Sequence, residues 1–111
     1  MSQLERIAEI MATYGKHGWR LERLLVCPQT LMELRASDQE LVKDAAVKEA
    51  SVDALWFSRP SHAEREAWEL RLVSDTQYAL FETFEKDELE EDREEVRREI
   101  EARLIEHATR S

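Results

Sequence analysis

Residues 56–72 read WFSRPSHAEREAWELRL, and the second half of this stretch indicates the kind of fold. After Glu66, apolar and charged side chains alternate with a period of two, which is typical of a β-strand with one buried face. The apolar members of the alternation are Trp68, Leu70 and Leu72, and the charged members are Glu69 and Arg71. The residues before Pro60, VDALWFSR (52–59), are rich in apolar and aromatic side chains, which predicts a preceding strand. Ser61 and Glu64 have the spacing of a capping box, so we expect one helical turn in the connection.

Residues 77–85, QYALFETFE, predict a third strand that forms a hairpin with the alternating one. A loop of two or four residues would place Leu70 opposite Phe81 and Trp68 opposite Thr83. The shared apolar face would hold Trp68, Leu70, Leu72, Ala79 and Phe81. The other face would hold Val73, Tyr78, Leu80, Phe84, Glu69, Arg71 and Glu82. A three-residue loop would shift the register and regroup the side chains of the third strand.

The N-terminal segment predicts a helix over residues 3–14. Ser2 and Glu5 have the spacing of a capping box, and Gly15 follows as a C-cap. One face of this helix is apolar, with Leu4, Ile7, Ala8, Met11 and Tyr14 at steps of three and four.

The next two segments predict a strand and a pair of helices. Residues 19–26 fit either a helix or a strand, and the nearby glycines and Pro28 favour a strand in which Arg23 is out of phase. Residues 30–50 hold two successive capping boxes, so we expect two helical pieces with a break at Ser37. The apolar positions of these pieces are Leu31, Leu34, Leu41, Val42, Ala45 and Ala46.

The C-terminal segment predicts a long, strongly charged helix over about residues 86–108. Its apolar stripe is narrow, consisting of Leu89, Val96, Ile100 and Leu104. Together the segments predict one α+β domain over residues 1–111, in the order α-β-α(α)-β-β-β-α. A mainly antiparallel sheet of about four strands would be covered by helices on one face.

The composition limits the partners and the location. The chain of 111 residues has 25 acidic and 16 basic residues, a net charge of −9, and lacks the basic face that nucleic acid or an anionic membrane requires. Its lone cysteine, Cys27, cannot form an intrachain disulfide, and charges interrupt the segment where a signal peptide would be apolar. No apolar run is long enough to span a bilayer. We therefore expect a cytoplasmic protein that binds neither nucleic acid nor membrane.

No motif for catalysis, a metal or a cofactor is present in the sequence. The three histidines are scattered, and the acidic C-terminal helix lacks the glycine and the alternating oxygens of a calcium loop. Cys27 and His17 lie ten residues apart across an expected turn, but no third residue is placed to orient them. We therefore predict no catalytic residue, no metal and no cofactor.

A small-anion site is the one binding chemistry that the residues suggest. Arginine beside an aromatic ring, with free bidentate donors, is a common way to hold carboxylate or phosphate. The candidate residues are Trp56, Arg59, Arg71 and Glu82. The alternative is a ladder of charges in which Arg71 compensates Glu69 and Glu82 across the strands.

Surplus apolar surface predicts association. The second face of the sheet and the helix stripe need covering, either by one another or by a second subunit. The residues of this expected interaction surface are Tyr78, Leu80, Phe84, Val96, Ile100 and Leu104. The first functional hypothesis is a small non-catalytic protein that acts as a homodimer or as a subunit of a complex, and the alternative is the anion-binding domain.

Overall fold

The computed structural model describes residues 2–37 and 42–110 of the chain, which form an α+β fold with a five-stranded mixed sheet. Helix α1 spans Gln3–Lys16, and the predicted capping box of Ser2 and Glu5 is present. The helix runs two residues beyond the predicted end, so Gly15 lies inside it. Gly18 instead adopts the left-handed backbone conformation, with φ +83°.

Residues 20–26 form a strand, as predicted, and a bulge explains the ambiguity of their pattern. Strand β1 (Arg20–Val26) shifts its register against its neighbour between Leu21 and Arg23. Leu21 and Leu24 therefore pack on one side of the sheet, whereas Leu25 packs on the other. The extra residue breaks the period of two and produces the spacing that resembles a helix.

The segment after β1 corrects the predicted helical pair. Helix α2 spans Pro28–Ala36 and ends at Ser37, where the break was predicted. Thr30 lies inside this helix and does not cap it. The second helical piece is wrong, because β2 (Ala46–Glu49) is a strand that pairs in parallel with β1. Leu41 of that piece lies outside the described residues.

The three predicted strands after residue 50 are present: β3 (Ala54–Pro60), β4 (Glu66–Leu72) and β5 (Ala79–Phe84). A short 3₁₀ turn, η2 (His62–Glu64), connects the first two, although the Ser61 side chain makes no capping bond. The sheet order is β2-β1-β3-β4-β5, and every pair except the parallel pair of β1 and β2 is antiparallel. The predicted α+β fold with a mainly antiparallel sheet is therefore present, but the sheet has five strands, not about four, because β2 was not predicted.

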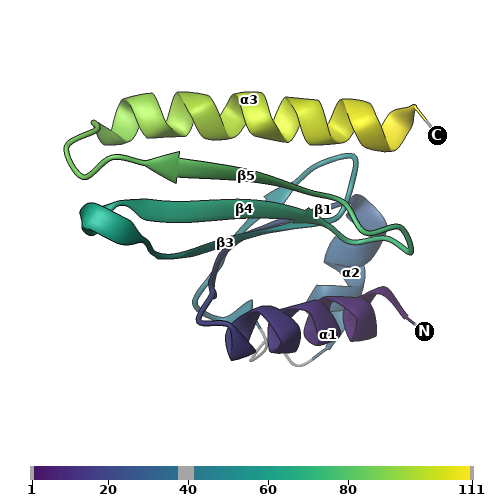
Figure 1. Cartoon of the computed structure of the whole chain (residues 1–111). Helices are drawn as coiled ribbons and strands as arrows, with labels where there is room; N and C mark the ends of the chain where they lie inside the picture. Colours follow the sequence, from purple (N-terminus) through teal and green to yellow (C-terminus); the bar gives the residue numbers. More distant parts are fainter. Residues whose placement is uncertain (1, 38–41, 111) are drawn as a thin grey trace.

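Helices cover both faces of the sheet, not one as predicted (Figure 1). Helices α1 and α2 lie on one side, and α3 (Glu90–Thr109) lies on the other, along β5. The core on the α1 side consists of Ile7, Ile10, Leu24, Val26, Leu34, Val42, Leu55, Phe57 and Val73. The core on the α3 side consists of Leu25, Ala54, Trp56, Trp68, Leu70, Leu72, Phe84, Ile100 and Leu104.

The register of β4 and β5 differs by one residue from the predicted even-loop version. Leu70 lies opposite Leu80, and Trp68 lies opposite Glu82. Leu80, Glu82 and Phe84 therefore share the α3 side with Trp68 and Leu70, whereas Phe81 faces the α1 side. This register buries Phe84 in the core and leaves Phe81 59% exposed.

Candidate functional site

The four residues of the predicted anion site do not converge. Trp56 is fully buried on the α3 side of the sheet, and Glu82 faces the same side from β5. Arg59 and Arg71 face the α1 side, and they line two separate hollows. The expectation that Arg71 and Glu82 share a face depended on the even-loop register, which the structure does not have.

Arg59 is held by its own chain near the end of α1. Its guanidinium lies 4.4 Å from the centre of the Trp19 ring and donates a hydrogen bond of 2.7 Å to the carbonyl of His17. These contacts tie the end of β3 to the turn before β1.

His17 precedes β1 and Cys27 follows it, so the seven-residue strand separates the two members of the Cys/His pair that the sequence analysis considered.

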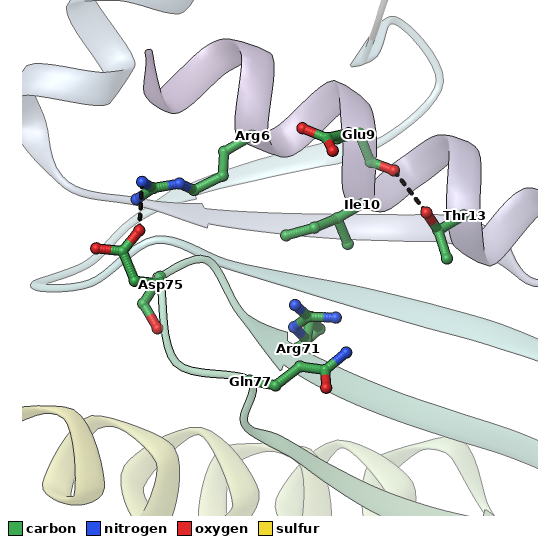
Figure 2. Close-up of a pocket in the computed structure, with 8 residues that line it drawn as sticks. Arg6, Glu9, Ile10, Thr13, Arg71, Asp75 and Gln77 are labelled. Atoms are coloured by element: carbon green, nitrogen blue, oxygen red, sulfur yellow. Dashed lines mark hydrogen bonds and ion pairs between the residues drawn. The ribbon is translucent and has the colours of Figure 1, made fainter. Parts of the chain in front are cut away.

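Arg71 faces a cavity of about 400 Å³ between α1 and the loop that joins β4 to β5 (Figure 2). Ile10 and Thr13 contribute from the helix, and Gln77 contributes from the loop. An ion pair between Arg6 and Asp75 closes one end of the cavity. The Nε of Arg71 donates to the carbonyl of Leu72 at 3.2 Å, which fixes the direction of the guanidinium.

Tyr14 occupies the neighbouring position on the α1 side. Its ring stacks on Phe57 at 4.1 Å between centroids, and its hydroxyl donates a hydrogen bond to Glu69. Burial and this carboxylate raise the pKa of Tyr14 to about 12, although the nearby Arg71 opposes the shift. Tyr14 is therefore a hydrogen-bond donor over the neutral pH range.

The predicted interaction surface is covered by helix α3 of the same chain. Phe84, Ile100 and Leu104 are buried between the sheet and the helix. Tyr78, Leu80 and Val96 pack against the same core, and the Tyr78 ring stacks on His107 at 3.6 Å. All six residues therefore take part in packing within the chain.

A charged cluster that the sequence did not predict joins α3 to the sheet. Arg97 is 2% exposed, and its guanidinium lies 4.0 Å from the centre of the Trp68 ring. It donates to Glu94 at 2.9 Å, and Glu94 also accepts two hydrogen bonds from Arg23 of β1. Hydrogen bonding to Arg23 holds the pKa of the Glu94 carboxyl at about 2. This cluster pairs the buried guanidinium through its terminal nitrogen, although the buried Nε of Arg97 has no hydrogen-bond partner among the described residues, and it links the helix to the sheet.

Glu101 extends the cluster one turn further along α3. Its carboxylate accepts a hydrogen bond from the indole of Trp56 at 2.9 Å and pairs with Lys48 of β2 at 3.1 Å. The buried tryptophan that was assigned to an anion site therefore uses its polar atom to hold a helix. A signal for this lies in the helical spacing, because Arg97, Glu101 and Leu104 follow one another at steps of four and three.

Asp53 is a second buried acid that the sequence did not place. Its carboxylate accepts hydrogen bonds from the Cys27 N–H at 2.8 Å, from the Thr30 hydroxyl at 2.7 Å and from the Gln3 amide at 2.7 Å. Asp53 thus caps α2 from the start of β3 and ties both helices on the α1 side to the sheet. The three hydrogen bonds to Asp53 therefore have a structural role.

Strand β5 forms one edge of the sheet, and it is longer than β2 at the other edge. The N–H of Leu72 bonds to the carbonyl of Tyr78, so alternation points the backbone groups of Ala79, Phe81 and Thr83 away from β4. The side chain of Glu82 accepts a hydrogen bond from the Thr83 N–H at 2.9 Å. Phe81, at the middle of this edge, is exposed.

Comparison with known proteins adds no functional assignment, because no family model, curated protein or solved structure matches this chain. Within the described residues, no helix is long and apolar enough to cross a membrane.

Proposed function

We propose that this protein acts without catalysis, by associating with a second copy of itself through the open edge of β5. The observation that supports the proposal is the exposure of Phe81 at the centre of that edge. An exposed edge strand presents unpaired N–H and C=O groups that can add a strand from another chain. A large aromatic side chain beside those groups adds apolar area to the same contact.

The two edges of the sheet differ in a way that favours β5. Strand β2 has only four residues, and two of them, Lys48 and Glu49, are charged. Short edge strands with charged side chains are a common protection against strand addition. Strand β5 has six residues, and its outward positions carry Ala79, Phe81 and Thr83, none of which is charged.

The edge is compatible with a two-fold axis. Three outward positions at a spacing of two are centred on Phe81. In an antiparallel pair, Ala79 would face Thr83 of the partner subunit, and Phe81 would face Phe81 of the partner subunit. The two phenyl rings would then meet on the α1 side of a continuous ten-stranded sheet. This self-complementarity favours a second copy over an unrelated strand.

The net charge of each protomer opposes association, and this predicts how the dimer responds to salt. Each protomer carries −9, so two protomers repel one another at low ionic strength. The contacts across the edge are backbone hydrogen bonds and phenyl rings, which carry no net charge and do not depend on low salt. We therefore expect the dimer to tighten when salt is raised from about 10 mM to about 150 mM, because screening shortens the range of the repulsion.

The experiment is light scattering and sedimentation of the wild type and of Phe81→Glu over about 1 µM to 1 mM, a range that brackets weak and moderate dimers. Phe81→Glu places two carboxylates opposite one another at the two-fold axis. It should weaken the dimer by at least about a hundredfold.

Met32→Glu is the matched control, because Met32 is 70% exposed on α2, away from β5. It introduces the same charge and removes an exposed apolar side chain, so it should leave the dimer unchanged. A wild type that remains monomeric at about 1 mM, or a dimer that Phe81→Glu and Met32→Glu affect equally, would contradict the proposal.

A further inference from the structure

Arg71 is distinguished by its lack of an acidic partner in an acidic protein. Among the described residues, the arginines with no carboxylate within 4 Å are Arg35, Arg59, Arg71, Arg98 and Arg103. Four of these are exposed to solvent, whereas Arg71 is half-buried. A guanidinium that has lost part of its hydration gains most from an anion when its donors have a fixed direction.

The surroundings of Arg71 form a cavity with mixed walls. Figure 2 shows Arg71 between Ile10 of α1 and Gln77 of the β4–β5 loop. The Ile10 side chain provides an apolar wall, and the Gln77 amide and the Thr13 hydroxyl provide polar groups. The volume of about 400 Å³ lies in the range of small-ligand sites.

The charges that line the cavity favour a monoanion over a dianion. Two carboxylates, Glu9 and Asp75, also line the cavity, and Arg6 neutralises only Asp75. A dianion such as phosphate would be repelled by Glu9 and would have a single unpaired guanidinium to bind. A monoanion matches that one guanidinium, and the apolar wall suits a short alkyl group.

We propose that this cavity binds a small organic monocarboxylate, with the carboxylate on the Arg71 guanidinium and the alkyl part against Ile10. Gln77 donates a further hydrogen bond from the loop. The Nε of Arg71 donates to Leu72 and the guanidinium also contacts the Tyr14 hydroxyl, so the carboxylate would bind the terminal N–H groups that these two contacts leave over. This inference goes beyond the proposed self-association and does not rest on it, because the cavity lies within one protomer.

The test is a titration of the ¹⁵N-labelled protein with propionate, followed by backbone amide shifts. For a ligand with five heavy atoms we expect a Kd of about 1–10 mM. The shifts should be centred on Thr13, Arg71 and Gln77. Propionamide has the same shape without the charge and should bind at least about tenfold more weakly. Phosphate should bind more weakly than propionate.

Arg71→Lys keeps the positive charge but removes the bidentate geometry, so it should weaken propionate binding at least about tenfold. Arg98→Lys is the matched control on the exposed face of α3 and should bind as the wild type does. Thermal unfolding of both variants checks that they are folded. The proposal is overturned if no amide moves at about 50 mM propionate, if propionamide or phosphate binds as well, or if Arg71→Lys binds like the wild type.

Discussion

The guanidinium of Arg97 lies 4.0 Å from the centre of the Trp68 ring, between helix α3 and strand β4. The same guanidinium pairs with Glu90 and Glu94 of its own helix. The contact combines a cation over an aromatic face with two hydrogen-bonded carboxylates, and the Arg97 side chain is buried, whereas Glu90 is largely exposed. A charged residue thus occupies a position where an apolar residue would ordinarily hold the helix.

Replacement of Arg97 tests how much the helix depends on this contact. Arg97→Ala removes the stem that packs on Trp68 and leaves a void, so we expect the free energy of unfolding to fall by about 2–4 kcal/mol. Arg97→Met keeps the packing without the charge and should cost less, about 0–2 kcal/mol. Urea denaturation followed by circular dichroism measures both values. Arg98→Ala, one position along and exposed, should change stability by no more than about 0.5 kcal/mol.

Glu94 makes stability depend on acid pH. Its pKa is about 2 in the folded protein, below the ordinary value of 4.5, because it accepts hydrogen bonds from Arg23. The unfolded chain therefore takes up a proton on this residue at a higher pH than the folded chain does. The stabilisation is fully present above about pH 4.5 and is lost as the pH falls toward 2.

The pH dependence is isolated by comparing Glu94→Gln with the wild type. At pH 7 the variant should be less stable by about 1–3 kcal/mol, because two arginines lose a charged acceptor. The difference should shrink steadily between pH 5 and pH 2, the window set by the two pKa values. Glu99→Gln changes the same charge at an exposed site of α3 and should show no such convergence. A difference that stays constant with pH would contradict the assignment.

Asp53 is expected to be the most sensitive polar residue on the α1 side. Asp53→Ala removes the acceptor for the Cys27 N–H, the Thr30 hydroxyl and the Gln3 amide. Two of these donors lie near the core, so we expect a loss of about 3–5 kcal/mol. Gln3→Ala removes a single donor and should cost about 0.5–1.5 kcal/mol. Comparable losses in thermal unfolding for the two variants would show that Asp53 does not hold α2 and α1 together.

The sequence was sufficient to predict most of the strands and helices, because they obey simple local rules. The alternation after Glu66 and the capping box at Ser2 needed no tertiary information. Strand β2 was not predicted, because its four residues lack a periodic pattern. The strand forms through its parallel pairing with β1, which is a tertiary contact. Local rules placed the break at Ser37 correctly, but they predicted a helix where the chain forms β2.

The residues of the predicted anion site do not converge for a different reason. A register shift of one residue moved Glu82 to the side of the sheet opposite Arg71, and the loop length that decides this shift was ambiguous in the sequence. Burial of Arg97 and Glu101 was not predicted, because charged residues are rarely buried unless they are paired. Their partners on the sheet, Trp68 for Arg97 and Trp56 for Glu101, are distant in the sequence, so only the fold could bring them together.

Glu82 provides a final test of the open edge. Its carboxylate bonds to the Thr83 N–H, one of the donors that a second β5 strand would use. Self-association must break this internal bond, so Glu82 weakens the dimer that we propose. Glu82→Ala frees the donor, and the dimer should tighten by about 3- to 10-fold, the equivalent of one hydrogen bond. Asp87→Ala removes the same charge from an exposed residue outside β5, so any effect of net charge alone appears in both variants. Equal tightening of the two variants in sedimentation experiments would mean that repulsion, and not the edge hydrogen bond, limits association.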